Sequence, residues 1–108
     1  YRFGLNLIGA THGHTQKSDR LPSIMAADRA KDWGETQHRV FFQGHLHHKH
    51  IKEYPGCLVE VLRTLAPGDA WSHAHGYRSG REMQAITYHK QFGEVVRNTC
   101  PVTKITTR

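Results

Sequence analysis

Short apolar runs separated by glycine, proline and polar residues predict the first elements of the chain. The run Phe3–Ile8 ends at Gly9 and is typical of a mostly buried strand. From residue 18 onwards, apolar side chains recur at helical spacing, so the pattern predicts one amphipathic helix over Ser18–Trp33. Pro22 falls in the first turn of that helix, where its missing N–H costs little, and Gly34 is the expected stop.

The rest of the chain is expected to form strands. His38–Gln43 and Leu58–Leu65 each have an apolar centre, whereas residues 66–80 are rich in glycine and are expected to be an irregular loop. Glu82–His89 and Glu94–Thr99 flank the turn sequence KQFG and predict an antiparallel hairpin. The order predicts an α/β fold with one βαβ unit, whose two strands are parallel, followed by antiparallel strands.

Two histidine clusters follow the two strands of the predicted βαβ unit. They are GATHGHTQ at residues 9–16 and FFQGHLHHKH at residues 41–50, and they hold six of the ten histidines. The carboxyl ends of parallel strands share one sheet edge, where open α/β sheets bind ligands. His45 and His47 are two residues apart and point the same way if extended, so with His12 they are candidate metal ligands. The same pattern also occurs in solvated polar loops.

The combined motifs resemble the C-terminal half of the calcineurin-like metallophosphoesterases, especially small bacterial and phage phosphodiesterases. THGHT follows a strand, and a helix, a second strand and GHLH come next, so the resemblance covers Phe3 to about Leu65 and the remainder more loosely. It implies an α+β sandwich of two sheets with a two-metal site at one edge. By this resemblance His12 and His45 bind the second metal and His47 the first, while His14 lies in the outer shell or near the substrate, as the catalytic candidate.

The chain departs from the family pattern in its missing motifs. The family also uses an Asp-x-His pair, a Gly-Asp motif with a bridging Asp and an Asn-His pair, all before these segments. The chain has no Asp-x-His and no Asn-His, and its Gly68-Asp69 follows GHLH, in the wrong order. The resemblance therefore implies part of a two-metal hydrolase, completed by an N-terminal half or a complementary chain. Of the two divalent ions (Mn, Zn, Fe or Ni), we expect at most one in this chain alone, without appreciable activity.

The net charge and the length of the chain indicate which classes of partner to expect. A net charge of +6 and 108 residues describe one small basic domain, or part of one, that favours a phosphoester substrate or nucleic acid. The alternative function is a non-catalytic metal- or nucleic-acid-binding module whose histidines hold a structural ion. No apolar run is long enough to span a bilayer, so we expect no membrane partner and a cytoplasmic location, in the host if phage-encoded. The sequence is compatible with a homo-oligomer.

Cys57 and Cys100 are expected to be free thiols, with Cys57 buried.

Overall fold

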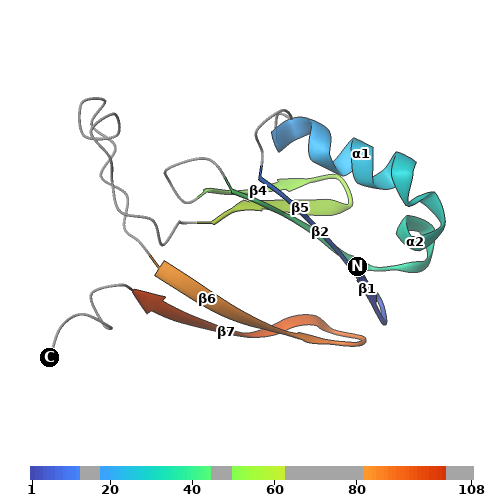
Figure 1. Cartoon of the computed structure of the whole chain (residues 1–108). Helices are drawn as coiled ribbons and strands as arrows, with labels where there is room; N and C mark the ends of the chain where they lie inside the picture. Colours follow the sequence, from blue (N-terminus) through green and yellow to red (C-terminus); the bar gives the residue numbers. More distant parts are fainter. Residues whose placement is uncertain (13–17, 45–49, 63–81, 102–108) are drawn as a thin grey trace, which may run out of the picture.

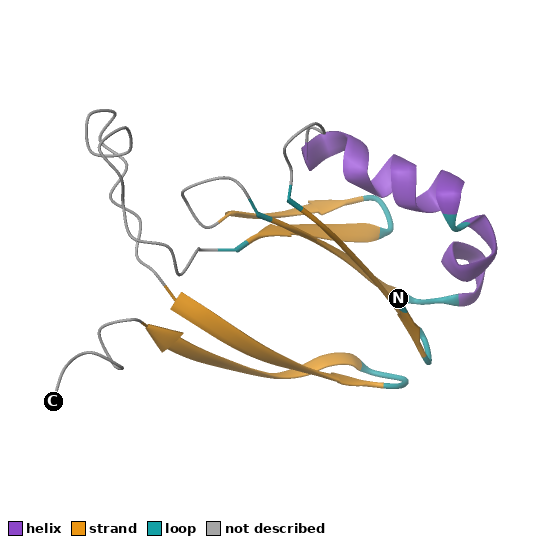
Figure 2. Cartoon of the chain, viewed as in Figure 1, coloured by secondary structure: helices purple, strands orange, loops and turns teal. Residues whose placement is uncertain are grey.

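The computed structural model describes residues 1–12, 18–44, 50–62 and 82–101, which form two sheets and a helical layer (Figures 1 and 2). The helices pack on one face of a five-stranded sheet, and a two-stranded hairpin lies across the other face. The elements in chain order are β1 (Arg2–Phe3), β2 (Asn6–Thr11), the 3-10 helix η1 (Ser18–Arg20), α1 (Leu21–Asp28), α2 (Ala30–Glu35), β3 (His38–Gln43), β4 (His50–Tyr54), β5 (Cys57–Val61), β6 (Glu82–His89) and β7 (Gly93–Pro101).

The large sheet contains the predicted βαβ unit. Its strand order is β1-β2-β3-β5-β4, with β2, β3 and β5 mutually parallel and the edge strands β1 and β4 antiparallel to their neighbours. Ile8 pairs with Val40, so the two predicted strands are adjacent and in parallel register. The prediction of a mixed α/β fold with a βαβ unit is therefore confirmed for the described part of the chain. Of the later strands, β4, β6 and β7 are antiparallel to their partners as expected, whereas β5 pairs with β3 in parallel.

The helical segment differs from the single helix predicted over Ser18–Trp33. A 3-10 turn precedes α1, and Arg29, with φ −128° and ψ 48°, separates α1 from α2. Pro22 lies in the first turn as expected, but Gly34 is within α2, which ends at Glu35. The bend at Arg29 directs α2 so that the Trp33 ring packs beside the β4–β5 turn, where it covers Gly56.

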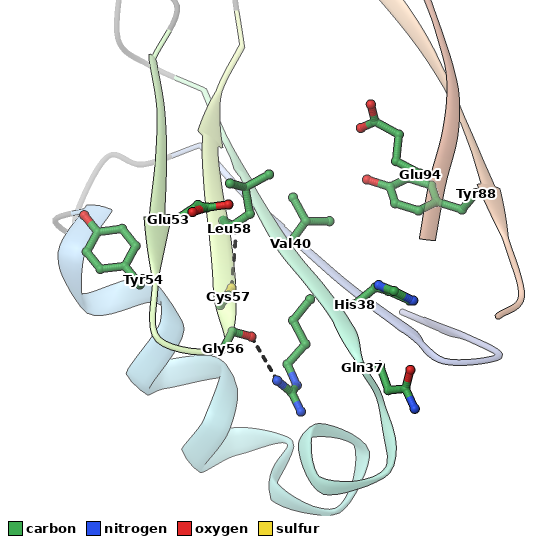
Figure 3. A pocket seen from close by; sticks show the side chains of 11 residues that line it. Gln37, His38, Val40, Glu53, Tyr54, Gly56, Cys57, Leu58, Tyr88 and Glu94 are labelled. Atoms are coloured by element: carbon green, nitrogen blue, oxygen red, sulfur yellow. Dashed lines mark hydrogen bonds between the residues drawn. The ribbon is translucent and has the colours of Figure 1, made fainter. Parts of the chain in front are cut away.

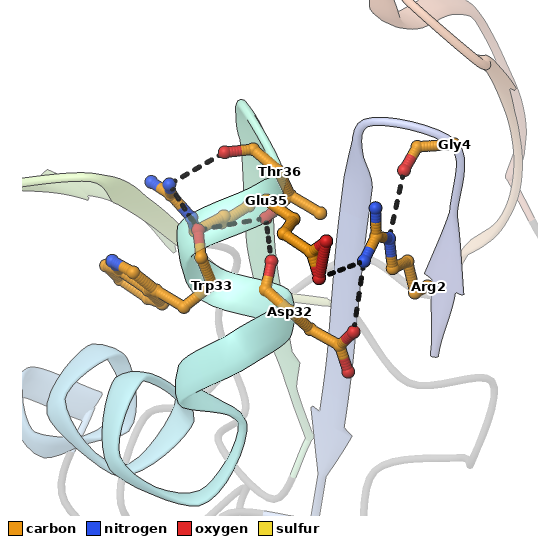
Figure 4. A network of polar contacts seen from close by, with 7 residues as sticks. Arg2, Gly4, Asp32, Trp33, Glu35 and Thr36 are labelled. Carbon is orange, nitrogen blue, oxygen red and sulfur yellow. Dashed lines mark hydrogen bonds and ion pairs between the residues drawn. The ribbon is translucent and has the colours of Figure 1, made fainter.

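Polar contacts hold α2 to the start of the sheet (Figure 4). Arg2 of β1 forms ion pairs with Asp32 at 3.3 Å and Glu35 at 3.2 Å, and Thr36 Oγ1 donates to the Asp32 carbonyl at 2.7 Å. Thr36 is buried, but Arg2, Asp32 and Glu35 are partly exposed, and exposed ion pairs contribute little to stability. The contacts instead fix the position at which α2 ends and the chain enters β3.

Several strands differ from the predictions, and β7 spans Gly93–Pro101 rather than the predicted Glu94–Thr99. The predicted strand Phe3–Ile8 is interrupted by a turn at Gly4, whose φ of 58° ends β1 before β2 begins. The strand β5 spans Cys57–Val61, and the end of the predicted Leu58–Leu65 run lies outside the described residues. The edge strand β4 was not predicted, because its sequence HIKEY is polar and largely exposed.

The apolar core lies between the large sheet and the helices. Leu7, Met25 and Cys57 form its buried centre, and Trp33 and Phe41 pack against it. Gly9 permits the close approach of α1, because a Cβ there would lie only 2.9 Å from Met25 Cε. Burial of these side chains is the main favourable contribution on this face of the sheet.

The predicted hairpin is β6–β7, attached to the opposite face of the sheet mainly through polar groups. Asn6 Nδ2 donates to the Phe3 carbonyl at 2.9 Å and to the His89 carbonyl at 2.8 Å, and Leu5 N–H donates to the Lys90 carbonyl at 2.7 Å. Farther along, Arg97 of β7 forms a bidentate pair with Glu60 of β5. The hairpin is thus tied to the sheet at two separate points.

Candidate metal centre

His12 follows the carboxyl end of β2, beside the carboxyl end of β3. Thr11 pairs with Gln43, and Gly44 N–H donates to the Thr11 carbonyl at 3.0 Å. A Cβ placed on Gly44 would lie 3.7 Å from His12 Nδ1. The exposed His12 ring therefore lies next to Gly44, the residue before His45 in the second histidine cluster.

The third parallel strand ends at the same edge. Leu62 N–H donates to the Gln43 carbonyl at 3.1 Å, so β2, β3 and β5 end side by side. Val61 pairs with Gln43 on one side and with His50, the first residue of β4, on the other. Gly44 and His50 are the residues on either side of positions 45–49, and both lie at the sheet edge where His12 lies.

The other predicted site residues are His14, His45 and His47, and all three lie outside the described residues. Their roles stay predictions. Within residues 1–12, 18–44, 50–62 and 82–101, no group of three or more His, Cys, Asp or Glu side chains could hold a metal ion. The structure therefore brings together the strand ends that carry the histidine motifs, with His12 as the described ligand candidate.

The two cysteines are free thiols, as expected. Cys57 is buried in the core, and this burial raises the pKa of its thiol to about 11, although the nearby Arg39 guanidinium lowers it slightly. A nucleophilic cysteine needs an accessible thiolate, which the raised pKa disfavours at neutral pH. Cys57 is a core residue, and its interpretation as buried is confirmed.

Sequence reasoning missed the ion-pair network between the two sheets. Glu60 is 0% exposed and Arg97 Nη2 donates to its Oε1 at 2.8 Å, while Arg97 also donates to Glu94 Oε1 at 2.5 Å. These hydrogen bonds, which Arg97 donates first to Glu60 and then to Glu94, raise the pKa of Arg97 above its ordinary value. The sequence contains one indication of this network, because Glu60 lies within the apolar run CLVEV and a buried charge needs a partner.

Comparison with known proteins gives no relative for this chain: no family model matches, and no curated protein or solved structure matches significantly. Among the helices of the described residues, none has the length and apolar character needed to cross a bilayer.

Proposed function

We propose that this chain supplies the histidine ligands of a metal-dependent phosphoesterase site, most suited to phosphodiesters, at the carboxyl edge of the large sheet. The observation that supports this proposal most is the position of His12 next to Gly44. Because β2 and β3 are adjacent and parallel, the strand ends that carry THGH and GHLH are neighbours. The resemblance to half of a metallophosphoesterase sandwich remains part of this proposal.

The chemistry of the residues fits a divalent transition metal. Imidazole nitrogens are ordinary ligands of Zn, Mn, Fe and Ni, and His12, His45 and His47 would each contribute one. Bound divalent ions at such a site polarise a phosphoester and activate water. This chain's residues would hold the ions in place, while His14 would lie beside the substrate, where an imidazole can donate or accept a proton.

Three neutral ligands do not offset the repulsion between two divalent ions. A bridging carboxylate is needed, and we propose that it comes with the remaining ligands from a complementary polypeptide. This division of the site leads to two expectations: the chain alone binds one ion and does not hydrolyse phosphoesters, and the completed site hydrolyses them. The net charge of +6 suits an anionic substrate.

Calorimetric titration of the chain with Zn²⁺ or Mn²⁺ tests the metal site. We expect one ion to bind and binding to weaken as pH falls through ~6.5, because ligation requires neutral imidazole. The double variant His45→Ala, His47→Ala should lose this binding, and His48→Ala, the matched control in the same cluster, should retain it. Unchanged binding in the double variant would place the ion at other histidines.

Hydrolysis of an aryl phosphodiester with Mn²⁺ tests the function. In the presence of a complementary half, His45→Ala or His47→Ala should remove most of the rate, whereas His48→Ala should have little effect. Equal losses in all three variants would contradict the assigned ligands. Metal binding that never leads to hydrolysis, even with the complement, would favour the alternative of a non-catalytic metal-binding module.

A further inference from the structure

A cavity of about 340 Å³ lies between the large sheet and the β6–β7 hairpin (Figure 3). Its sheet side includes Val40 of β3 and Leu58 of β5, which are direct cross-strand partners. Its hairpin side includes Tyr88 and Glu94, and Glu53 of β4 lies at the sheet edge. The volume is at the lower end of the range for small-ligand sites, roughly 300–1,000 Å³.

The cavity is separate from the candidate metal centre. Val40 lies near the amino end of β3, whereas Gly44 follows the carboxyl end of the same strand. In extended backbone the two are about 13 Å apart, at roughly 3.3 Å per residue. A ligand in the cavity therefore does not share ligands with an ion held beside His12.

The cavity combines apolar surface with an aromatic ring. Val40 is buried and Leu58 half-buried on the sheet face, and Tyr88 extends from the hairpin toward that face (Figure 3). Such surfaces bind a flat apolar group through packing and exclusion of water.

Two carboxylates, Glu53 and Glu94, and one guanidinium, Arg39, line this cavity. Arg97 is shared between Glu60 and Glu94, so one guanidinium faces two carboxylates. Within the described part of the chain, the Glu53 carboxylate has no hydrogen bond or ion pair, and Glu53 is held by its backbone pairing with Leu58. The pKa of Tyr88 is raised to about 12, chiefly by burial and then by the charge of Glu94, while the charge of Arg97 lowers it.

The nearest cations are engaged elsewhere. Arg39 lines the cavity, but its guanidinium lies over the Trp33 ring at 4.3 Å and donates to the carbonyls of Trp33 at 2.7 Å and Gly56 at 2.9 Å. Lys52 lies over the Tyr54 ring at 5.2 Å, and its register partner Val59 faces the helices, away from the hairpin. Neither side chain neutralises Glu53.

We propose that this cavity binds a small organic cation that joins a flat apolar body to an amidinium, guanidinium or primary ammonium group. The apolar body packs on Leu58 and Val40, and the cationic group donates charge-assisted hydrogen bonds to Glu53, with Glu94 on the opposite wall. Planar amidinium and guanidinium groups match a carboxylate with two parallel hydrogen bonds, so they are the preferred members of this class.

Titration of the chain with benzamidinium, followed by nuclear magnetic resonance, tests the proposal. We expect saturable shifts at Val40, Leu58 and Tyr88, and at least tenfold weaker binding of benzamide, its neutral isostere, because the charge-assisted bonds are lost. Glu53→Gln should weaken benzamidinium binding by about tenfold. Glu35→Gln removes the same charge from α2, on the other face of the sheet, and should leave binding unchanged.

A second variant tests the position of the ligand. Leu58→Trp fills the cavity and should abolish the benzamidinium shifts in a chain whose other resonances show the native fold. The His45→Ala, His47→Ala variant should bind benzamidinium normally, so this site is tested independently of the metal. Equal affinity for benzamide, equal losses in Glu53→Gln and Glu35→Gln, or no saturable shifts would each overturn the proposal.

Discussion

The two faces of the five-stranded sheet are covered in opposite ways. On the helix face, Leu7, Met25 and Cys57 form a buried apolar cluster. On the hairpin face, the most buried side chains are Asn6 and Glu60, each 0% exposed, and both bond to the hairpin. One face is therefore held by exclusion of water and the other by specific polar pairs.

This difference has consequences for how each face tolerates change. Apolar packing is non-directional, so its free energy falls in proportion to the surface or volume removed. A buried ion pair is directional, and removal of one partner leaves the other charge unpaired in a region of low dielectric. The hairpin face should therefore lose more stability when one partner of the ion pair is replaced. It should lose less when both partners are replaced together by apolar side chains of similar volume.

Arg97→Ala is expected to have the largest effect. It leaves Glu60 buried without its guanidinium, which should lower the free energy of unfolding by about 3–5 kcal/mol. Urea denaturation, followed by circular dichroism, measures this loss. Glu94→Ala removes only the partly exposed partner of Arg97 and should cost far less, at most about 1 kcal/mol.

The matched double variant Glu60→Leu, Arg97→Met sharpens the same test. It removes both charges and supplies apolar groups of similar volume, so most of the stability lost in Arg97→Ala should return. A double variant as unstable as Arg97→Ala would show that the pair itself, rather than the unpaired charge, determines the stability of the hairpin face.

On the helix face, Leu7→Ala should be the next largest change. Leu7 is 2% exposed in the core, and removal of a buried leucine side chain costs about 2–5 kcal/mol through lost burial and the remaining cavity. Leu7→Met keeps the volume and should cost less than about 1.5 kcal/mol. Equal losses from the two substitutions would indicate that this face depends on side-chain shape rather than on apolar volume.

The contrast between the faces also explains which elements the sequence could predict. The bounds of β3 and β6 match their predictions, His38–Gln43 and Glu82–His89, because apolar or alternating runs mark both strands. The strand β4 was missed because it lies at an edge, where its side chains need not be apolar. The bend at Arg29 was missed because hydrophobic spacing carries no information about a change in helix direction.

For the candidate site, the sequence predicted the placement of His12 but not the inter-sheet network. The adjacency of β2 and β3 follows from the general geometry of a βαβ unit, and this geometry brings His12 beside Gly44. The partnership of Glu60 with Arg97 spans 37 positions. A charge in a sequence does not identify its partner at such a separation, because the packing of the hairpin on the sheet decides it.

The smallest expected effects concern the free energy of unfolding at alkaline pH. Each face of the sheet has its own group that titrates there. Burial raises the pKa of Cys57 from 9.0 to about 11 on the helix face and that of Tyr88 from 10.0 to about 12 on the hairpin face. In both cases the unfolded chain releases its proton at lower pH than the folded chain does. Stability is therefore complete below the unfolded pKa and falls as pH rises through the window to the folded pKa.

Urea denaturation at a series of alkaline pH values separates the two contributions. Cys57→Ala should flatten the decline that begins near pH ~9, and Tyr88→Phe should flatten the part that begins near pH ~10. Cys100→Ala is the matched control, since Cys100 is a partly exposed thiol of β7 with no comparable burial. If Tyr88→Phe leaves the decline unchanged, the hairpin face admits enough water to solvate the phenolate. The hairpin would then bury Tyr88 less effectively than the helices bury Cys57.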